Sequence, residues 1–320
     1  MSILGIDIGG TKTIVALADS QGRILVSKRF DTPRDSGPEP VIKRIIGVGR
    51  EILGETGVGE RDIEGIGIAC GGPLDPEDGR LIFVPNIPGW EDLPIARIFS
   101  EEFKAPAWLD NDATAAGFAE AVFGAGRGVS NLAYFTVSTG IGGAIIIGGR
   151  PYRGGGNAAE FGHQKILPDG PACTCGDKGC LEALSSGRSI AREAASGLNS
   201  NPTSLLFRWT EGDVSRVTAE MVNRAAAAGD PYAACIWDTA MGHLGIGVSN
   251  VVSILNPQMV ILGGGVTRAG DRLLEPVREV VVARTMSELA RNVSIVLAGL
   301  GDNSAIVGAI TVALEKVGRV

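Results

Sequence analysis

One pattern occurs twice in the sequence: an apolar strand, a turn rich in glycine and hydroxyl residues, and a second apolar strand. The first copy is IDIGGTKTIVAL, which starts at Ile6, and the second is TVSTGIGGAIII, which starts at Thr136. A single copy is typical of an ordinary β-hairpin, whose turn needs only a pair of turn residues. Two copies far apart in the chain indicate two related domains, each of which contributes one hairpin.

The length and the order of elements fit this interpretation. A chain of 320 residues exceeds the roughly 100–200 residues of a usual domain, and strands that alternate with helices indicate an α/β fold. We expect a smaller domain of residues 1–112 plus 301–320, on which the last helix packs, and a larger domain of residues 113–300. Helical spacing is predicted in the C-terminal half at residues 216–229, 231–255, 270–288 and 303–317.

Charge and hydropathy exclude several classes of partner. The net charge is −7 and no cluster of Lys or Arg is present, so we expect no nucleic-acid partner. The apolar runs are short and interrupted by glycine, which argues against a membrane segment. The start, MSILGIDIGG, lacks the basic and apolar regions of a secretory signal, so a cytoplasmic protein is predicted.

The first glycine turn has the composition of a phosphate-binding loop. Backbone N–H groups of Gly9 and Gly10 can turn toward an anion, Thr11 adds a hydroxyl donor and Lys12 a point charge. Asp7, at the end of the preceding strand, is a candidate for holding Mg²⁺ through water, because this ion sheds its hydration reluctantly. A plain hairpin turn is the alternative for this loop.

Two further loops favour nucleotide binding over the plain turn. Thr139, Gly140 and Gly142 lie in the turn of the second copy and repeat the hydroxyl-and-glycine composition of the first. Gly264 and Gly265 follow the apolar strand MVIL, where bare backbone would admit a base or a ribose. An ordinary strand-to-helix turn is the alternative for this last loop.

Five cysteines in a cytoplasmic chain indicate metal binding or core packing before disulfides. His163, Cys173, Cys175 and Cys180 supply one imidazole and three thiolates, a set that suits tetrahedral zinc with no open position, which is a structural site. A disulfide between Cys173 and Cys175 is disfavoured by the compartment and by strain between such near neighbours.

The motifs together resemble the sugar-kinase/Hsp70/actin superfamily and, within it, the ROK family (repressor, open reading frame, kinase). The segments that carry the likeness are DIGGTK at 7–12, EFGH at 160–163 and CTCGDKGCLE at 173–182. The resemblance covers nearly the whole chain. It implies a two-domain ribonuclease-H-like α/β fold whose interdomain cleft holds a nucleotide between the two hairpin loops.

The resemblance also implies roles for the segment Asp110-Asn111-Asp112 at the start of a helix. Asp112 matches the catalytic base toward a sugar hydroxyl and Asn111 a sugar ligand, with Asp110 in reserve. A helix N-cap is the structural alternative, and both roles can hold at once. We expect the helix N-terminus to lower the pKa of Asp112, and a weak base suffices because the acceptor's proton leaves late in phosphoryl transfer.

Five more residues match sugar-binding positions of the family. They are Gly72, Asn86, Glu160, His163 and Glu182. For Gly72 and Asn86, simple turn residues are an equal alternative. Zinc would fasten the loop PDGPACTCGDKG and fix the two glutamates beside the sugar, while His163 could bind zinc through one ring nitrogen and the sugar through the other.

The resemblance implies an ATP-dependent hexose kinase that uses Mg²⁺ and structural Zn²⁺ and forms a homodimer. We predict phosphorylation of glucose to glucose 6-phosphate, a step of glycolysis. N-acetylmannosamine, N-acetylglucosamine, fructose and mannose kinases are alternatives. A ROK repressor is disfavoured because the sequence starts at the phosphate loop, without a helix-turn-helix segment. A sugar sensor without activity is disfavoured by the presence of Asp7, Lys12 and Asp112 together.

Overall fold

The structure is a computed structural model that describes residues 1–33, 37–84 and 87–320. Asn86, a predicted sugar-binding residue, lies outside the described residues. The chain forms two compact units: unit one contains Met1–Gly128, Ala144–Ala159 and Asp302–Val320, and unit two contains Val129–Gly143 and Glu160–Gly301. The division into these two compact units does not test the predicted domain boundaries at residues 112 and 300, which stay predictions.

Unit one is built on a five-stranded sheet with the order β3-β2-β1-β4-β8. Strands β1 to β3 form an antiparallel meander, and β4 and β8 extend it in parallel. The bounds are β1 Ser2–Ile8, β2 Lys12–Asp19, β3 Ile24–Asp31, β4 Ile63–Cys70 and β8 Ala107–Asn111. The first predicted β-hairpin is therefore present as β1 and β2.

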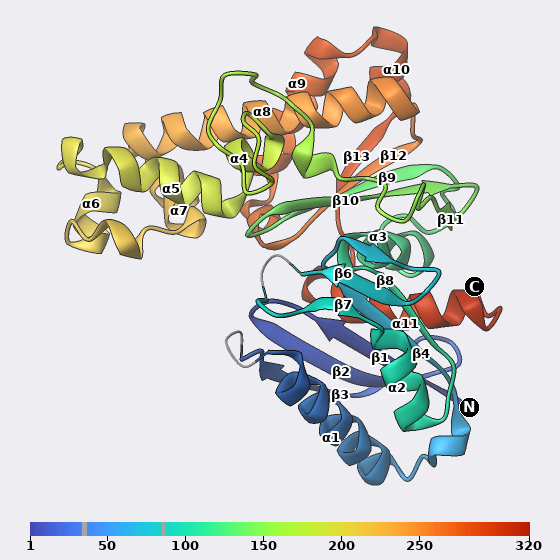
Figure 1. The fold of residues 1–320 in the computed structure, drawn as a ribbon. Coiled ribbons are helices and arrows are strands. Elements are labelled where there is room, and N and C mark those ends of the chain that lie inside the picture. Colours follow the sequence, from blue (N-terminus) through green and yellow to red (C-terminus); the bar gives the residue numbers. More distant parts are fainter. Residues whose placement is uncertain (34–36, 85–86) are drawn as a thin grey trace. The chain divides into compact units, whose positions relative to one another are not determined.

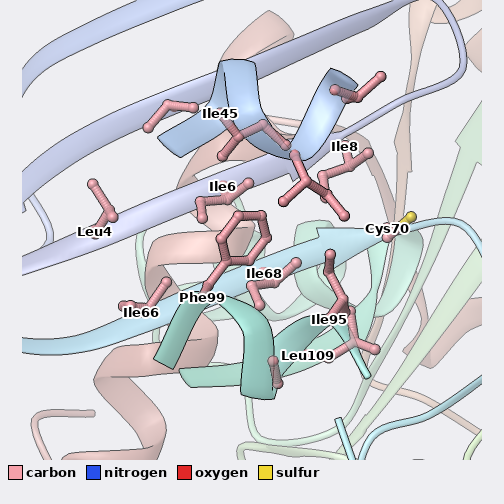
Figure 2. Close-up of a cluster of buried hydrophobic side chains, with 14 of the residues drawn as sticks. Leu4, Ile6, Ile8, Ile45, Ile66, Ile68, Cys70, Ile95, Phe99 and Leu109 are labelled. Atoms are coloured by element: carbon pink, nitrogen blue, oxygen red, sulfur yellow. The ribbon is translucent and has the colours of Figure 1, made fainter. Parts of the chain in front are cut away.

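Helices cover both faces of this sheet (Figure 1), because its strands are apolar at successive positions. Along β1, Leu4, Ile6 and Ile8 join the cluster with α1 (Pro38–Thr56) and α2 (Ile95–Phe103), as Figure 2 shows, whereas Ile3 points to the other face. There α3 (Asp112–Val122) and α11 (Ser304–Lys316) pack.

The close approach of α11 to the sheet depends on a residue without a side chain. A Cβ placed on Gly67 of β4 would lie 1.7 Å from the carbonyl oxygen of Ala309 in α11. The last helix thus packs on the N-terminal sheet, as the sequence predicted.

The long glycine- and proline-rich segment after β4 contains regular secondary structure in the part that the structure describes. It contains three short strands, β5 (Leu74–Asp75), β6 (Arg80–Phe83) and β7 (Glu91–Leu93), which form an antiparallel sheet in this order. Buried apolar residues, Leu74, Leu81 and Trp90, anchor this sheet on the core of unit one.

The second large sheet has the order β11-β10-β9-β12-β13. Numbered within their own sheets, both large sheets therefore read 3-2-1-4-5. The parallel pairs also correspond, because β9 pairs with β12 as β1 pairs with β4, and β12 with β13 as β4 with β8. The duplication indicated by the two glycine hairpins is present in the topology. The bounds are β9 Leu132–Val137, β10 Ile141–Ile147, β11 Arg150–Pro151, β12 Met259–Gly263 and β13 Ser294–Leu297.

Unit two carries most of the helices (Figure 1). They are α4 Leu181–Ser185, α5 Gly187–Gly197, α6 Leu205–Thr210, α7 Ala219–Ala227, α8 Pro231–Leu255, α9 Asp271–Arg284 and α10 Ser287–Asn292. The predicted helix 231–255 is confirmed, whereas the predicted helix 270–288 is interrupted because Thr285 adopts an extended conformation. Short 3-10 turns are η2 Glu60–Asp62, η3 Phe161–His163, η4 Leu198–Ser200, η5 Val214–Arg216, η6 Gly265–Ala269 and η7 Gly301–Asn303.

Within the described ranges, no helix combines the length and the apolar character that crossing a membrane would require.

Candidate functional site

The first glycine turn joins β1 to β2 in unit one and is held by Thr32, the residue that follows β3. The N–H of Gly9 donates to the carbonyl of Lys12 at 3.0 Å and closes the turn. Thr32 holds it from outside, since its N–H donates to the Thr11 carbonyl at 2.9 Å and its hydroxyl to the Gly9 carbonyl at 2.8 Å. Gly10 lies within the same turn. These contacts fix the backbone of the predicted phosphate loop before any ligand is bound.

Asp7 lies at the sheet end beside this turn and is 5% exposed. The pKa of its carboxyl is raised to about 7, because burial and, to a smaller extent, the negative charge of Asp112 raise it and together outweigh Lys12, which lowers it. The three predicted residues are therefore electrostatic neighbours within unit one. A buried carboxyl beside a second carboxylate is an environment that a divalent cation would stabilise, so Asp7 fits a magnesium-binding role.

Asn111 and Asp112 lie where β8 meets α3. The Asn111 side chain is the N-cap, because its oxygen accepts from the N–H groups of Ala113 at 2.9 Å and Thr114 at 3.3 Å. A Cβ placed on Gly72 would lie 3.6 Å from the Asn111 amide nitrogen, so these two predicted sugar-binding residues are neighbours.

The pKa of Asp112 differs from the expectation. Asp112 is exposed, yet desolvation by the surrounding protein raises its pKa and outweighs the N–H of Ala113, which donates to its carboxylate at 2.8 Å and lowers it. The helix N-terminus therefore lowers the pKa as expected, but desolvation reverses the net direction, so the expected net lowering is wrong. A raised pKa makes Asp112 a stronger base.

The reserve candidate Asp110 is engaged elsewhere. Its side chain is 2% exposed and is bound by the guanidinium of Arg153 at 2.8 Å. This ion pair leaves Asp112 as the available carboxylate of the Asp110-Asn111-Asp112 segment.

The four predicted zinc ligands come together in unit two, with one donor atom of each within 4.8 Å of the others. The Sγ atoms of Cys175 and Cys180 are 3.7 Å apart, and Cys173 Sγ is 3.6 Å from His163 Nδ1. Tetrahedral zinc with its usual bond lengths requires about 3.8 Å between two sulfurs and about 3.6 Å between sulfur and nitrogen. The donor set and spacing therefore fit a closed zinc site.

The loop that carries these ligands has little apolar core of its own. Its buried cluster contains Cys173, Cys180 and Ala183. Burial raises the pKa of the Cys173 thiol to about 11, so a metal would have to displace its proton to bind. Bonds to a metal would supply order to such a loop.

The ring of His163 is oriented for two partners. Its Nδ1 faces Cys173, and its Nε2 lies 3.9 Å from the carboxylate of Glu160. Glu160 precedes the 3-10 turn η3, and its backbone carbonyl accepts the N–H of His163 at 3.0 Å. The turn places both side chains together.

Glu182 has a structural role that the sequence did not indicate. One of its carboxylate oxygens accepts the N–H of Ile141 at 2.8 Å, and the other accepts the Thr174 hydroxyl at 3.2 Å. Because Ile141 follows the second glycine turn and Thr174 lies between two zinc ligands, Glu182 joins the zinc loop to this hairpin. Gly140 permits the contact, since a Cβ there would lie 2.4 Å from the same carboxylate oxygen.

A cavity of about 660 Å³ opens in unit two beside the second glycine turn. Thr139 and Gly265 line it. Gly264 permits the two loops to approach closely, because a Cβ there would lie 2.5 Å from the carbonyl oxygen of Val137. Gly142 lies in β10, next to this turn. Two predicted nucleotide-binding loops thus border one cavity large enough for a small ligand.

Sequence reasoning missed the cationic lining of this cavity. Arg188, Arg224 and Arg268 line it, and Arg188 belongs to the N-terminus of α5, where Ser186 is the N-cap. Arginines and a helix N-terminus both favour phosphate groups. The motif Ser186-Gly187-Arg188 was the available signal, because serine before a helix marks its N-terminus.

The comparisons with known proteins agree with this geometry. A sequence profile of the ROK family matches residues 3–316. A glucokinase from Thermotoga maritima is 35% identical over 319 residues, covering 99% of both proteins. A xylose repressor from Caldicellulosiruptor bescii is 29% identical and aligns with 99% of this chain and 79% of its own.

Two solved structures are also similar. The ROK hexokinase from Thermus thermophilus has a TM-score of 0.82 at 36% identity, with 99% of each chain covered. A ROK family glucokinase from Streptomyces griseus, in complex with glucose and AMPPNP, has a TM-score of 0.82 at 33% identity, with 98% of this chain and 100% of that chain covered.

Proposed function

The chain belongs to the ROK family and is an ATP-dependent hexose kinase of the ribonuclease-H-like fold, and we propose that it phosphorylates glucose to glucose 6-phosphate. The observation that carries the proposal is the grouping in unit one of Asp112, Asp7 and Lys12 beside the glycine turn, where the parallel strands β1, β4 and β8 end side by side. Glucose is favoured because the relatives above include a glucokinase, and one similar structure holds glucose and AMPPNP.

In the proposed reaction a sugar hydroxyl attacks the γ-phosphate of ATP in line. Asp112 accepts the hydroxyl proton, for which its raised pKa is favourable, and Asn111 and Gly72 contact the sugar. Lys12 and the N–H groups of the first turn bind the phosphates of ATP. Positioning and electrostatic stabilisation supply most of the catalysis in such a transfer.

Asp7 would hold magnesium through a water molecule. When bound, magnesium offsets negative charge on the phosphates of ATP. Asp7 itself must be ionised for this role, and its pKa of about 7 makes ionisation sensitive to pH near neutrality.

Zinc would be held by His163, Cys173, Cys175 and Cys180 in a structural role. His163 would keep its Nε2 for a sugar hydroxyl, because its Nδ1 faces the cysteines. Glu160, beside that Nε2, would accept sugar hydroxyls, and Glu182 would do so while its other contact fixes the second glycine turn.

The cavity beside this turn is the proposed site for the base and ribose of ATP. Gly264 and Gly265 supply close backbone approach, and Thr139 and Gly140 lie on the phosphate side. A homodimer, a cytoplasmic location and a place in glycolysis stay predictions.

The test is ADP release from Mg·ATP with glucose and, separately, with N-acetylmannosamine. Wild type should turn over glucose, and Asp112→Asn should lower kcat by about 10²- to 10⁴-fold, the usual contribution of a general base. The matched control is Asp62→Asn, an exposed carboxylate in unit one. Turnover of N-acetylmannosamine alone would make that sugar, and not glucose, the substrate. No turnover of any hexose would favour a sugar-binding regulator.

A further inference from the structure

Arg153 links the catalytic segment to a distant part of unit one. Its Nε donates to Asp110 Oδ2 at 2.8 Å, and its Nη2 lies 2.8 Å from the same oxygen in an ion pair. The Nη2 also donates to Glu315 of α11 at 2.8 Å. The other oxygen of Asp110 accepts the N–H of Asn111 at 2.9 Å. Asp110 thus connects Arg153 to the proposed sugar ligand Asn111 through its two carboxylate oxygens.

Asn157, four residues later, holds a second part of the proposed sugar site. Its amide oxygen accepts the N–H of Leu74 at 3.1 Å, and its amide nitrogen donates to the Leu74 carbonyl at 3.0 Å. A Cβ placed on Gly72 would lie 3.2 Å from the same Asn157 oxygen. The asparagine therefore fixes the backbone that carries Gly72.

The segment between these residues has no side chains with which to pack. Gly154, Gly155 and Gly156 have no side chains, and they border a cavity of about 540 Å³ that Trp108 and Lys316 also line. The polar contacts of Arg153 and Asn157 attach this segment to Asp110 and Leu74.

We propose that Arg153 and Asn157 form a clasp that positions Asn111 and Gly72 for the sugar, so that both are positioning residues for the acceptor and not for ATP. The inference rests on the proposed function, because it takes Asn111 and Gly72 as sugar contacts. Neither residue needs to touch the sugar. Each acts through one backbone segment, Asp110–Asn111 or Gly72–Leu74, at the sugar side of unit one.

The clasp predicts a change confined to one substrate. In Arg153→Met and in Asn157→Leu, the KM for the sugar and its Kd without nucleotide should rise about tenfold or more, since small displacements of positioning groups cost up to about 10²-fold. The KM for ATP should stay within about twofold. Arg150→Met is the matched control, because Arg150 lies in the same segment, is 60% exposed and reaches Glu315 only at 3.7 Å.

A fold defect is separated from the proposed role by a double variant. Arg153→Met leaves Asp110 buried without its cation, whereas Arg153→Met with Asp110→Asn removes both charges and should restore stability. If it restores thermal stability but the sugar Kd stays raised, the clasp is supported. Equal changes in both KM values, or a loss of active protein with unchanged KM values, would overturn the inference.

The proposed function and the clasp fail in different ways. If wild type prefers another hexose, glucose is wrong, and the comparison of variants is repeated with that hexose. If wild type binds glucose and both clasp variants bind it equally well, the clasp alone is wrong. If wild type binds no hexose, both are wrong.

Discussion

Gly140→Ala tests whether Glu182 holds the second glycine turn in the conformation that binds nucleotide. The added methyl would lie 2.4 Å from a Glu182 oxygen, and ordinary contact begins at 3.4 Å, so the carboxylate must move by about 1 Å. A movement of that size breaks the 2.8 Å hydrogen bond from the N–H of Ile141.

The expected cost follows from the charge on Glu182. A hydrogen bond to a charged group contributes about 1.5–3 kcal/mol, which corresponds to about 10- to 150-fold in a dissociation constant. Because Glu182 is only partly buried, we expect the lower end of this range. The Kd for Mg·AMPPNP, measured by calorimetry without sugar, should rise about tenfold, with the zinc content unchanged.

A double variant tests the cause. In the Glu182→Ala background the oxygen that the methyl would meet is absent, so Gly140→Ala should add little to the Kd. Nucleotide binding at the wild-type level in Gly140→Ala would refute the role of this contact. An equal increase in both backgrounds would show that the added methyl acts on some group other than Glu182.

Three further predictions concern stability, metal and packing. The pKa of Asp7 rises from 3.8 to about 7 on folding, so the folded state keeps a proton that the unfolded state releases and stability falls between about pH 4 and pH 7. Asp7→Asn should therefore raise the Tm of the magnesium-free protein more at pH 8 than at pH 5, and it should abolish kinase activity. An equal rise in Tm at both pH values would contradict the raised pKa of Asp7. Cys175→Ser should lower bound zinc well below one ion per chain by elemental analysis and expose the 171–180 loop to proteolysis; full zinc occupancy would exclude Cys175 as a ligand. Gly67→Ala should cost about 1–3 kcal/mol or more by urea unfolding because of its clash with Ala309, whereas Gly47→Ala, which meets nothing within 4 Å, should be neutral or stabilising.

Local sequence patterns were sufficient for several features. The repeated hairpin predicted the duplicated topology, because alternation of apolar residues and glycine turns acts over a few neighbouring positions. The donor set of His163, Cys173, Cys175 and Cys180 is recognisable because these ligands lie close in sequence. Asn111 was predicted as a candidate N-cap for the same reason, since a cap contacts only the next turn of its own helix.

Other features depend on residues that only folding brings together. The raised pKa of Asp112 results from desolvation in the folded structure, which outweighs the local effect of the helix N-terminus. The bond from Ile141 to Glu182 joins positions 41 apart, and the contact of Asn157 with Leu74 joins positions 83 apart. The sequence identifies which functional groups this protein carries and how they are spaced. Desolvation and long-range hydrogen bonds exist only in the packed structure, and they decide the pKa of each group and the partner that it binds.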